Sequence, residues 1–80
     1  MIQRSYKYIN VTEETIELTE GKVYKIKYNY RCCHSIVNRE IIGRFIGEDS
    51  ERLMFDCSTE YRSNIIYVYY LDILSVAEIL

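Results

Sequence analysis

The sequence predicts a small all-β domain, with five or six short antiparallel strands closed into a barrel. Residues 21–32, GKVYKIKYNYRC, alternate almost without a break between two kinds of side chain. Successive side chains on a strand leave opposite faces, so a period of two indicates a half-buried strand with a charged outer face. The pattern recurs later in the chain, and the sequence contains no proline. Closing a chain of short strands into a barrel removes exposed edges that would otherwise invite aggregation.

The alternation assigns the side chains of this segment to two faces. The inner set is Tyr24, Ile26, Tyr28, Tyr30 and Cys32, and the outer set is Lys25, Lys27, Asn29 and Arg31. The other predicted strands are residues 1–11, 14–18, 41–47, 53–57 and 65–76. The last of these is long enough to split into two strands, or to bend near Asp72, and then to pair with an early strand and close the sheet.

The connections are predicted from polar residues and from weak periodicity. Residues 33–38 are interpreted as a connection, 48–51 as a polar turn and 58–64 as a polar loop. Thr12 is a candidate cap for a single helical turn, although a direct lead into a strand at 14–18 is favoured. The last four residues, 77–80, either fray or form a helical turn. Gly43 lies inside a predicted strand, where glycine is costly unless the strand bends or another backbone passes close by.

Length and composition indicate one domain over residues 1–80, near the size at which a single core is only just sufficient. The formal charge is −2, from 12 acidic and 10 basic residues. This balance argues against general nucleic-acid binding, which usually needs a basic excess. The longest apolar stretch, 65–74, is broken by Asp72 and is too short to span a bilayer. We therefore expect no membrane association.

The three cysteines, Cys32, Cys33 and Cys57, form a poor disulfide framework because the count is odd and two are adjacent. No segment resembles a secretory signal, so a reducing, cytoplasmic location is expected. Together with His34 the cysteines make the only metal-like cluster. Adjacent cysteines on a strand point to opposite faces and cannot easily reach one ion. No metal and no cofactor are predicted, and Cys32 and Cys57 are interpreted as small apolar core residues.

Catalytic patterns are absent from the sequence. His34 follows Cys33 directly, but sequence neighbours do not by themselves form a nucleophile–base pair, and no orienting acid is indicated. Glu48 and Asp49 fall in a predicted solvated turn. The 3 glycines do not form a phosphate-binding loop. The chain is therefore predicted not to be an enzyme.

Residues 42–56, IGRFIGEDSERLMFD, resemble the first motif of the Sm-like family, a glycine-containing strand, an Asp-containing turn and an apolar strand. Gly43, Phe45, Gly47 and Asp49 fall on matching positions, and VYYLDILSV resembles the last strands of the bacterial host-factor RNA chaperone of that family. The resemblance implies an SH3-like or Sm-like barrel. The family's RNA-contacting residues are not carried over: Leu53 stands where its pocket has Asn, and Tyr70 and Leu71 replace its basic pair. The phrase LTEGKVYKI is similar to the opening of small barrel proteins of phages and their hosts.

Nine tyrosines and no tryptophan make a skewed aromatic set. Tyrosine can fill a small barrel and its rim, and it also suits binding surfaces because it offers rigid area and a hydroxyl group. The predicted function is a non-enzymatic module, in the manner of small phage-encoded effectors, that binds and regulates or inhibits a protein partner. The predicted binding residues are Tyr28, Tyr30, Tyr67, Tyr69, Tyr70, Lys25, Lys27 and Arg31, and Tyr61 is a further exposed candidate.

Two alternative functions belong to other classes. In the first, Lys25, Lys27 and Arg31 contact phosphates of a nucleic acid while tyrosines stack on its bases. The alternation counts against this function because it places lysines and tyrosines on opposite faces. In the second, a homo-oligomer holds a nucleotide or another small molecule at subunit junctions. Self-association is also expected for a barrel with an apolar last strand.

Overall fold

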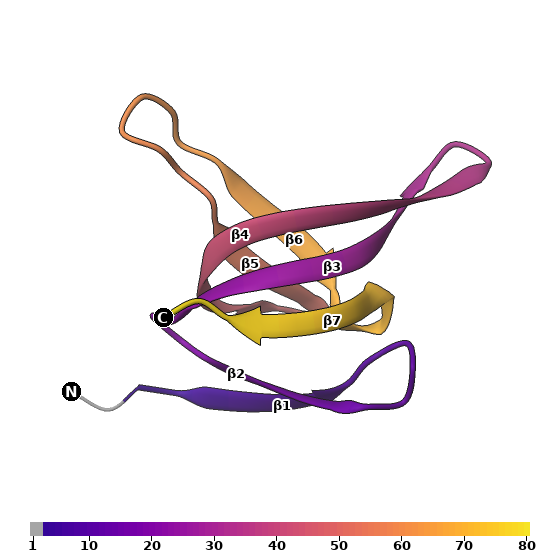
Figure 1. Ribbon diagram of the computed structural model, residues 1–80, viewed down its shortest axis with the longest axis horizontal. Coiled ribbons are helices and arrows are strands. Elements are labelled where there is room, and N and C mark those ends of the chain that lie inside the picture. Colours follow the sequence, from indigo (N-terminus) through magenta and orange to yellow (C-terminus); the bar gives the residue numbers. More distant parts are fainter. Residues whose placement is uncertain (1–2) are drawn as a thin grey trace.

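The computed structural model describes residues 3–80 and confirms the all-β, antiparallel class. Its elements are β1 (Ser5–Ile9), β2 (Thr15–Thr19), β3 (Val23–Cys32), β4 (Ser35–Asp49), β5 (Arg52–Asp56), β6 (Ile65–Tyr69), the 3₁₀ turn η1 (Tyr70–Asp72) and β7 (Ile73–Glu78). β1 and β2 form one sheet. The other five strands form a second sheet in the order β6-β5-β4-β3-β7 (Figure 1).

The sheet does not close into a barrel, so that part of the prediction is wrong. The last strand returns to an early one as expected, since β7 pairs with β3. β6 and β7 nevertheless remain the two edges of the large sheet. The β1–β2 hairpin lies beside the large sheet as a separate layer and contributes Ile16 and Leu18 to the common core. Over the described residues 3–80 the fold thus has seven strands, because η1 divides residues 65–76 and both early segments form strands.

The alternation of β3 is confirmed in its first half. Tyr24, Ile26 and Tyr28 are buried, and Lys27 is exposed between the last two. Beyond Tyr28 the strand leaves the body of the protein, so inward-pointing positions no longer meet a core. Cys32 is consequently exposed, and its interpretation as a core residue is wrong.

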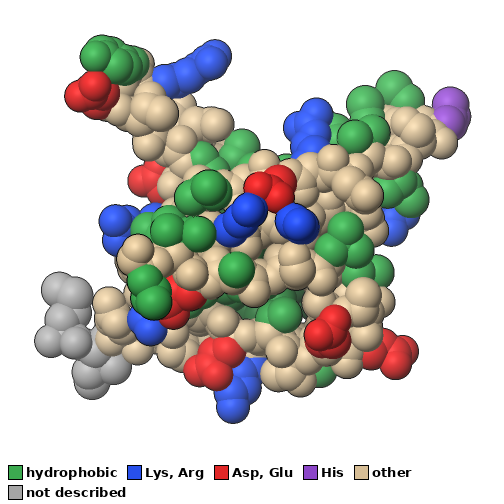
Figure 2. Space-filling view, in the orientation of Figure 1, with side chains coloured by type: hydrophobic (Ala, Val, Ile, Leu, Met, Phe, Trp, Pro, Cys, Tyr) green, Lys and Arg blue, Asp and Glu red, His purple; other side chains and the backbone are tan. Residues whose placement is uncertain are grey.

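Residues 33–38 are mostly strand and not a connection. β3 and β4 form a long hairpin in which Cys32 pairs with Ser35 across a two-residue turn. Cys33 in this turn has a positive φ of 56°. Figure 2 shows the hairpin projecting from the body with the histidine at its tip. The segment lacks periodicity because both of its faces are exposed. The predicted turn at 48–51 likewise shrinks to two residues, since β4 continues to Asp49 and β5 begins at Arg52.

The expected helical turn lies at neither predicted position. The helical turn is η1. Ala77 and Glu78 belong to β7, and residues 14–18 contribute to β2, which is the favoured alternative for that segment. The first strand begins at Ser5, and the part of that prediction that falls on residues 1–2 lies outside the described residues. Residues 58–64 form a loop, as predicted, with an isolated bridge between Thr59 and Arg62. Within residues 3–80 the structure contains no helix with the length and hydropathy needed to cross a bilayer.

The core lies between the large sheet and the β1–β2 hairpin. Its fully buried side chains are Phe45, Phe55, Leu18, Ile26, Leu53, Ile73 and Val68. Removing such a side chain from water contributes about 1.5–3 kcal/mol each. Phe45 packs against Phe55 with ring centroids 5.6 Å apart and against Tyr6 of β1 at 5.7 Å, edge to face. This aromatic group holds the two sheets together.

Candidate functional site

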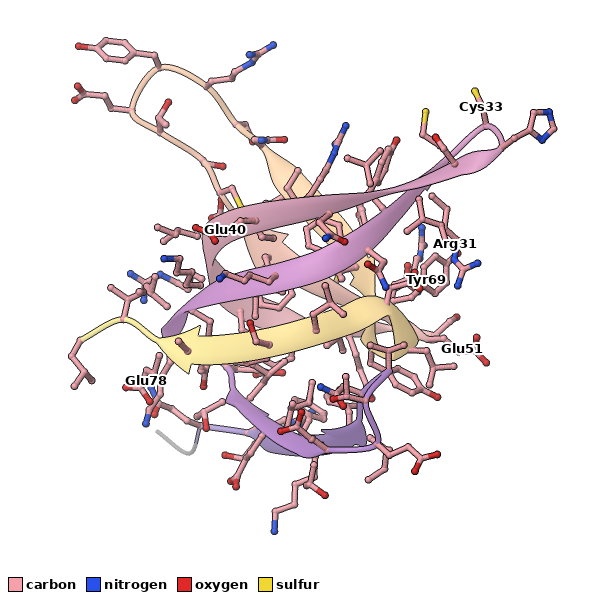
Figure 3. The ribbon with its side chains drawn as sticks, turned by 45° about the vertical axis from the view of Figure 1, so that its right-hand side comes forward. Arg31, Cys33, Glu40, Glu51, Tyr69 and Glu78 are labelled. Atoms are coloured by element: carbon pink, nitrogen blue, oxygen red, sulfur yellow. The ribbon has the colours of Figure 1, made fainter. Side chains whose placement is uncertain are left out.

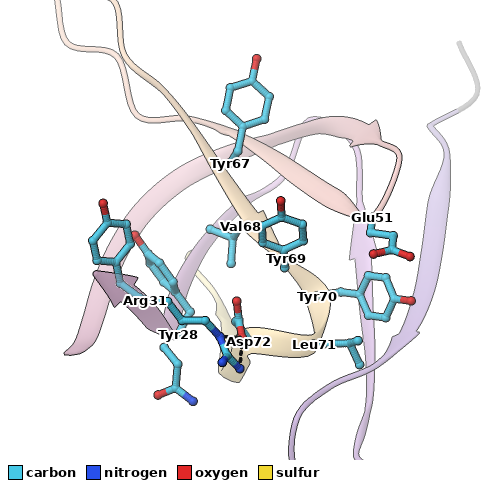
Figure 4. Close-up of a pocket in the computed structure, with 11 residues that line it drawn as sticks. Tyr28, Arg31, Glu51, Tyr67, Val68, Tyr69, Tyr70, Leu71 and Asp72 are labelled. Carbon is cyan, nitrogen blue, oxygen red and sulfur yellow. Dashed lines mark hydrogen bonds and ion pairs between the residues drawn. The ribbon is translucent and has the colours of Figure 1, made fainter. Parts of the chain in front are cut away.

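A concave surface of about 380 Å³ brings together most of the predicted binding residues (Figure 4). We call it the tyrosine pocket. Its lining residues are Tyr28, Asn29, Tyr30, Arg31, Glu51, Tyr67, Val68, Tyr69, Tyr70, Leu71 and Asp72. All five predicted binding tyrosines and Arg31 are therefore at one site, although they come from β3, β6 and η1.

Strand periodicity places the tyrosines of β6 at the opening. Val68 is 2% exposed and anchors the strand in the core, so its neighbours Tyr67 and Tyr69 turn outward and are about half exposed. On β3, Tyr28 is buried at the base and Tyr30 is partly open to solvent. The site therefore combines a rigid aromatic base with accessible rings, an arrangement suited to packing against an apolar or planar group of a ligand.

Charged side chains border the rings. The Arg31 Nε lies 3.4 Å from an Asp72 carboxylate oxygen, and the Asp72 side chain is 15% exposed whereas that of Arg31 is 70% exposed. Two further guanidinium groups lie over tyrosine rings, Arg39 at 3.8 Å from the Tyr30 centroid and Arg52 at 4.6 Å from that of Tyr67. Such cation–π contacts orient the rings from outside the pocket.

Tyr70 connects the pocket to the β1–β2 hairpin. Its ring stacks on Tyr8 with centroids 5.3 Å apart. The Tyr8 hydroxyl donates a hydrogen bond of 2.6 Å to the Glu48 carboxylate. Burial, and then this hydrogen bond to a negative acceptor, raise the pKa of Tyr8 well above its usual value. The phenol therefore keeps its proton, and continues to donate to Glu48, to a higher pH than an ordinary tyrosine would.

The other two predicted residues lie elsewhere. The Lys25 and Lys27 ammonium groups are 3.4 Å and 3.9 Å from the two carboxylate oxygens of Glu40 on the outer face of the β3–β4 hairpin. Figure 3 shows Glu40 on a different side from Arg31 and Tyr69. The lysines are therefore separated from the tyrosines, as the alternation of β3 indicates. Tyr61 is 91% exposed in the β5–β6 loop and does not line the pocket.

Sequence reasoning missed Glu51, Leu71 and Asp72 as site residues. Asp72 interrupts an otherwise apolar run, and this interruption was a usable signal. Glu51 carries no such signal, because it reaches the site only through the tight turn between β4 and β5.

The cysteines do not converge. Cys32 and Cys33 are exposed in the β3–β4 hairpin, and Cys57 is half-buried after β5. Burial, with a smaller contribution from the Asp56 charge, raises the pKa of the Cys57 thiol. No group of three or more histidine, cysteine or acidic side chains in the described part of the chain is placed to hold a metal ion.

The raised pKa of Tyr8 predicts a loss of stability in alkali. The unfolded tyrosine ionises near pH 10, whereas the folded one keeps its proton to higher pH, so stability present below pH ~10 declines as pH rises above it. Tyr8→Phe should lower the free energy of unfolding at neutral pH and weaken this decline. Part of the decline should remain, because the pKa values of Tyr6 and Cys57 are also raised. Urea unfolding between pH 7 and about pH 11 measures both effects.

Tyr61→Phe is the matched control for this experiment, since the Tyr61 side chain is almost fully exposed. It should leave the alkaline decline unchanged. An equally steep decline in Tyr8→Phe and in the unsubstituted protein would show that the Tyr8–Glu48 contact does not contribute to it.

The residues behind the Sm-like resemblance lie mainly on one strand. Gly43, Phe45, Gly47 and Asp49 all belong to β4, and Gly47 has a φ of 136° at an irregularity in the pairing with β5. Leu53, where the family's pocket has Asn, is buried in the core and unavailable to a ligand. The chain matches no protein-family model, no curated protein and no solved structure in comparisons with each, so the site and the fold are the basis for assigning a function.

Proposed function

We propose that this protein is a non-enzymatic interaction module that binds a segment of a protein partner in the tyrosine pocket. The observation that carries the proposal is the convergence of five tyrosines from three separate elements on one concave surface. Tyrosine is enriched among the residues that dominate binding energy at protein interfaces. A buried base and accessible rim rings resemble the organisation of such sites, in which a few central aromatic residues contribute most of the affinity.

An SH3-like order of strands, in a sheet that stays open, is part of the proposal. Five consecutive strands, β3 to β7, form one antiparallel sheet in which the last strand returns beside the first, and a 3₁₀ turn precedes that last strand. Short connections join β3 to β4 and β4 to β5. These features support that strand order. The open edges of the sheet could pair with a second copy of the chain, so they also support a homo-oligomer. The three free thiols support a reducing, cytoplasmic location.

The experiment is affinity purification from the native host with the full chain as bait, in moderate salt and after nuclease treatment. We expect a defined partner that the double variant Tyr67→Ala with Tyr69→Ala loses. Loss of one hot-spot tyrosine weakens binding by about 2 kcal/mol, or roughly 30-fold. The matched control Tyr61→Ala makes the same chemical change outside the pocket and should retain the partner. Retention by the pocket variant would contradict the proposal.

The same purification repeated without nuclease, together with native mass spectrometry, separates the two alternatives. Nucleic-acid binding predicts capture that is lost with nuclease or salt and in the variant Lys25→Ala with Lys27→Ala. The ion pairs of both lysines with Glu40 count against that function. A small-molecule role predicts a compound of defined mass that co-purifies with an oligomer in native mass spectrometry. Either result would replace the protein-partner proposal.

A further inference from the structure

A second groove, of about 520 Å³, lies between β2 and β7 and shares no lining residue with the tyrosine pocket. Figure 1 shows β7 next to the β1–β2 hairpin, and no strand pairing joins the two sheets there. The groove is lined by Asn10, Glu14, Thr15, Ile16, Glu17, Thr19, Lys22, Tyr24, Leu74, Ser75, Val76 and Glu78. Its walls are therefore the free edges of two sheets.

The hydrogen-bond pattern identifies which backbone groups face the groove on the β2 side. Glu20 N–H donates to the Arg4 carbonyl at 2.8 Å, and Asn10 N–H donates to the Glu14 carbonyl at 3.0 Å. In an antiparallel ladder, every second residue of a strand forms its backbone hydrogen bonds with the same neighbouring strand. The backbone groups of the even-numbered residues of β2 therefore point to β1. Thr15 and Glu17 therefore direct their backbone groups away from β1, toward the groove.

The same reasoning applies to β7. Ile79 N–H donates to the Val23 carbonyl at 2.8 Å. At the C-terminal end of β7 the backbone groups of the odd-numbered residues therefore point to β3. Val76 and Glu78 direct their backbone groups to the groove. A row of unpaired N–H and C=O groups is a template for an added strand, and here two such rows flank one groove.

The directions of the two edges suit a single inserted strand. β2 and β7 run the same way in Figure 1, so a strand running oppositely would be antiparallel to both. At one end Val11 N–H donates to the Ile73 carbonyl at 3.4 Å, and at the other Thr19 N–H donates to the Tyr24 hydroxyl at 2.8 Å. These contacts mark the length of open edge, which is the central part of each strand.

The side chains around the groove indicate the composition of the strand. Ile16 and Val76 lie on its inner side in contact with the core, which favours apolar side chains at alternate positions. Lys22 is 3.5 Å from Glu78. Within the described residues Glu14 and Glu17 take part in no ion pair. Lys7 lies opposite Glu17 on β1, but the two side chains do not form an ion pair either. Figure 2 shows acidic side chains, with a basic side chain beside them, along this lower side of the molecule.

We infer that the groove between β2 and β7 binds an extended segment of a protein partner in which apolar and basic residues alternate. The segment pairs with both edges as an additional strand and joins the two sheets. Its apolar side chains pack between Ile16 and Val76, and its basic side chains lie beside Glu14 and Glu17. This mode of recognition takes affinity from backbone hydrogen bonds and specificity from alternate side chains.

The experiment uses the full chain and a synthetic peptide of about six residues that alternates valine with lysine, a length typical of one strand. Nuclear magnetic resonance should show perturbed amides at Glu17 and Val76, and their hydrogen exchange should slow on binding. Methylation of the peptide's backbone nitrogens should abolish binding by removing its donors. The variant Glu14→Lys with Glu17→Lys should weaken binding about tenfold, as expected for the loss of two exposed ion pairs and their reversal.

A peptide alternating valine with glutamate is the matched control and should not bind. Because both glutamates are exposed, the charge-reversed protein should remain folded, and its own amide spectrum checks this. Equal binding of the acidic peptide, perturbation confined to the tyrosine pocket, or no perturbation by the basic peptide at about millimolar concentration would overturn the inference. Slow exchange at Glu17 and Val76 without peptide would also overturn it, because the groove would then be closed by direct pairing or by a second copy.

Discussion

Replacing Phe45 with alanine is expected to lower the free energy of unfolding by about 3–5 kcal/mol. The Phe45 side chain is fully buried, and it contacts Phe55 of the large sheet and Tyr6 of the β1–β2 hairpin. Alanine would remove the aromatic surface from both contacts and leave a cavity between the two layers. Small domains are stable by only about 5–15 kcal/mol in total, so much of the margin would be lost.

Urea unfolding followed by circular dichroism measures this change. The matched control is Ile46→Ala, which shortens the next side chain of the same strand at an exposed position and should change stability by about 0.5 kcal/mol or less. A third variant, Phe45→Leu, should fall between the two because it keeps part of the buried volume. Similar midpoints for Phe45→Ala and Ile46→Ala would show that Phe45 does not join the layers.

Sequence reasoning located strands where one face is buried. β5 and the first half of β3 follow the alternation of apolar and polar residues closely, because their inner positions meet the core. It failed at the start of β4, where residues 35–40 are exposed on both faces and nothing selects an alternating pattern. It also failed on barrel closure. Whether β6 or β7 finds a partner depends on the long-range path of the sheet, and local patterns do not encode that path.

The candidate site was predictable to the extent that it consists of one residue type. The tyrosines were identified from composition and from their positions on strands, and the structure places five of them together. Lys25 and Lys27 belong to the predicted site only as phosphate contacts of the nucleic-acid alternative, and they lie apart from the tyrosines because side chains one residue apart on a strand lie on opposite faces. Glu51 and Asp72 were missed because they reach the pocket through a turn and a 3₁₀ element.

Gly43→Ala is expected to lower the free energy of unfolding by about 1–3 kcal/mol through overpacking. A Cβ atom at this position would lie 2.7 Å from the Cys57 Sγ, 3.2 Å from the Asp56 carbonyl oxygen and 3.2 Å from the Phe55 Cβ. The glycine inside the strand is thus explained by the close passage of β5. The backbone conformation itself needs no glycine, since Gly43 does not have a positive φ.

A double-mutant cycle with Cys57→Ala separates the sources of the cost. That variant removes the Sγ atom and with it the shortest contact, so Gly43→Ala should cost less in its background, by about 0.5 kcal/mol or more. The cost that remains belongs to the Asp56 carbonyl and the Phe55 Cβ, which β5 holds in place. Ile42→Ala changes an exposed neighbouring position of β4 and is the control for the effect of placing alanine in this strand. Equal stability of Gly43→Ala and the unsubstituted protein would mean that β4 and β5 are farther apart here, and that the close passage of β5 does not explain the glycine.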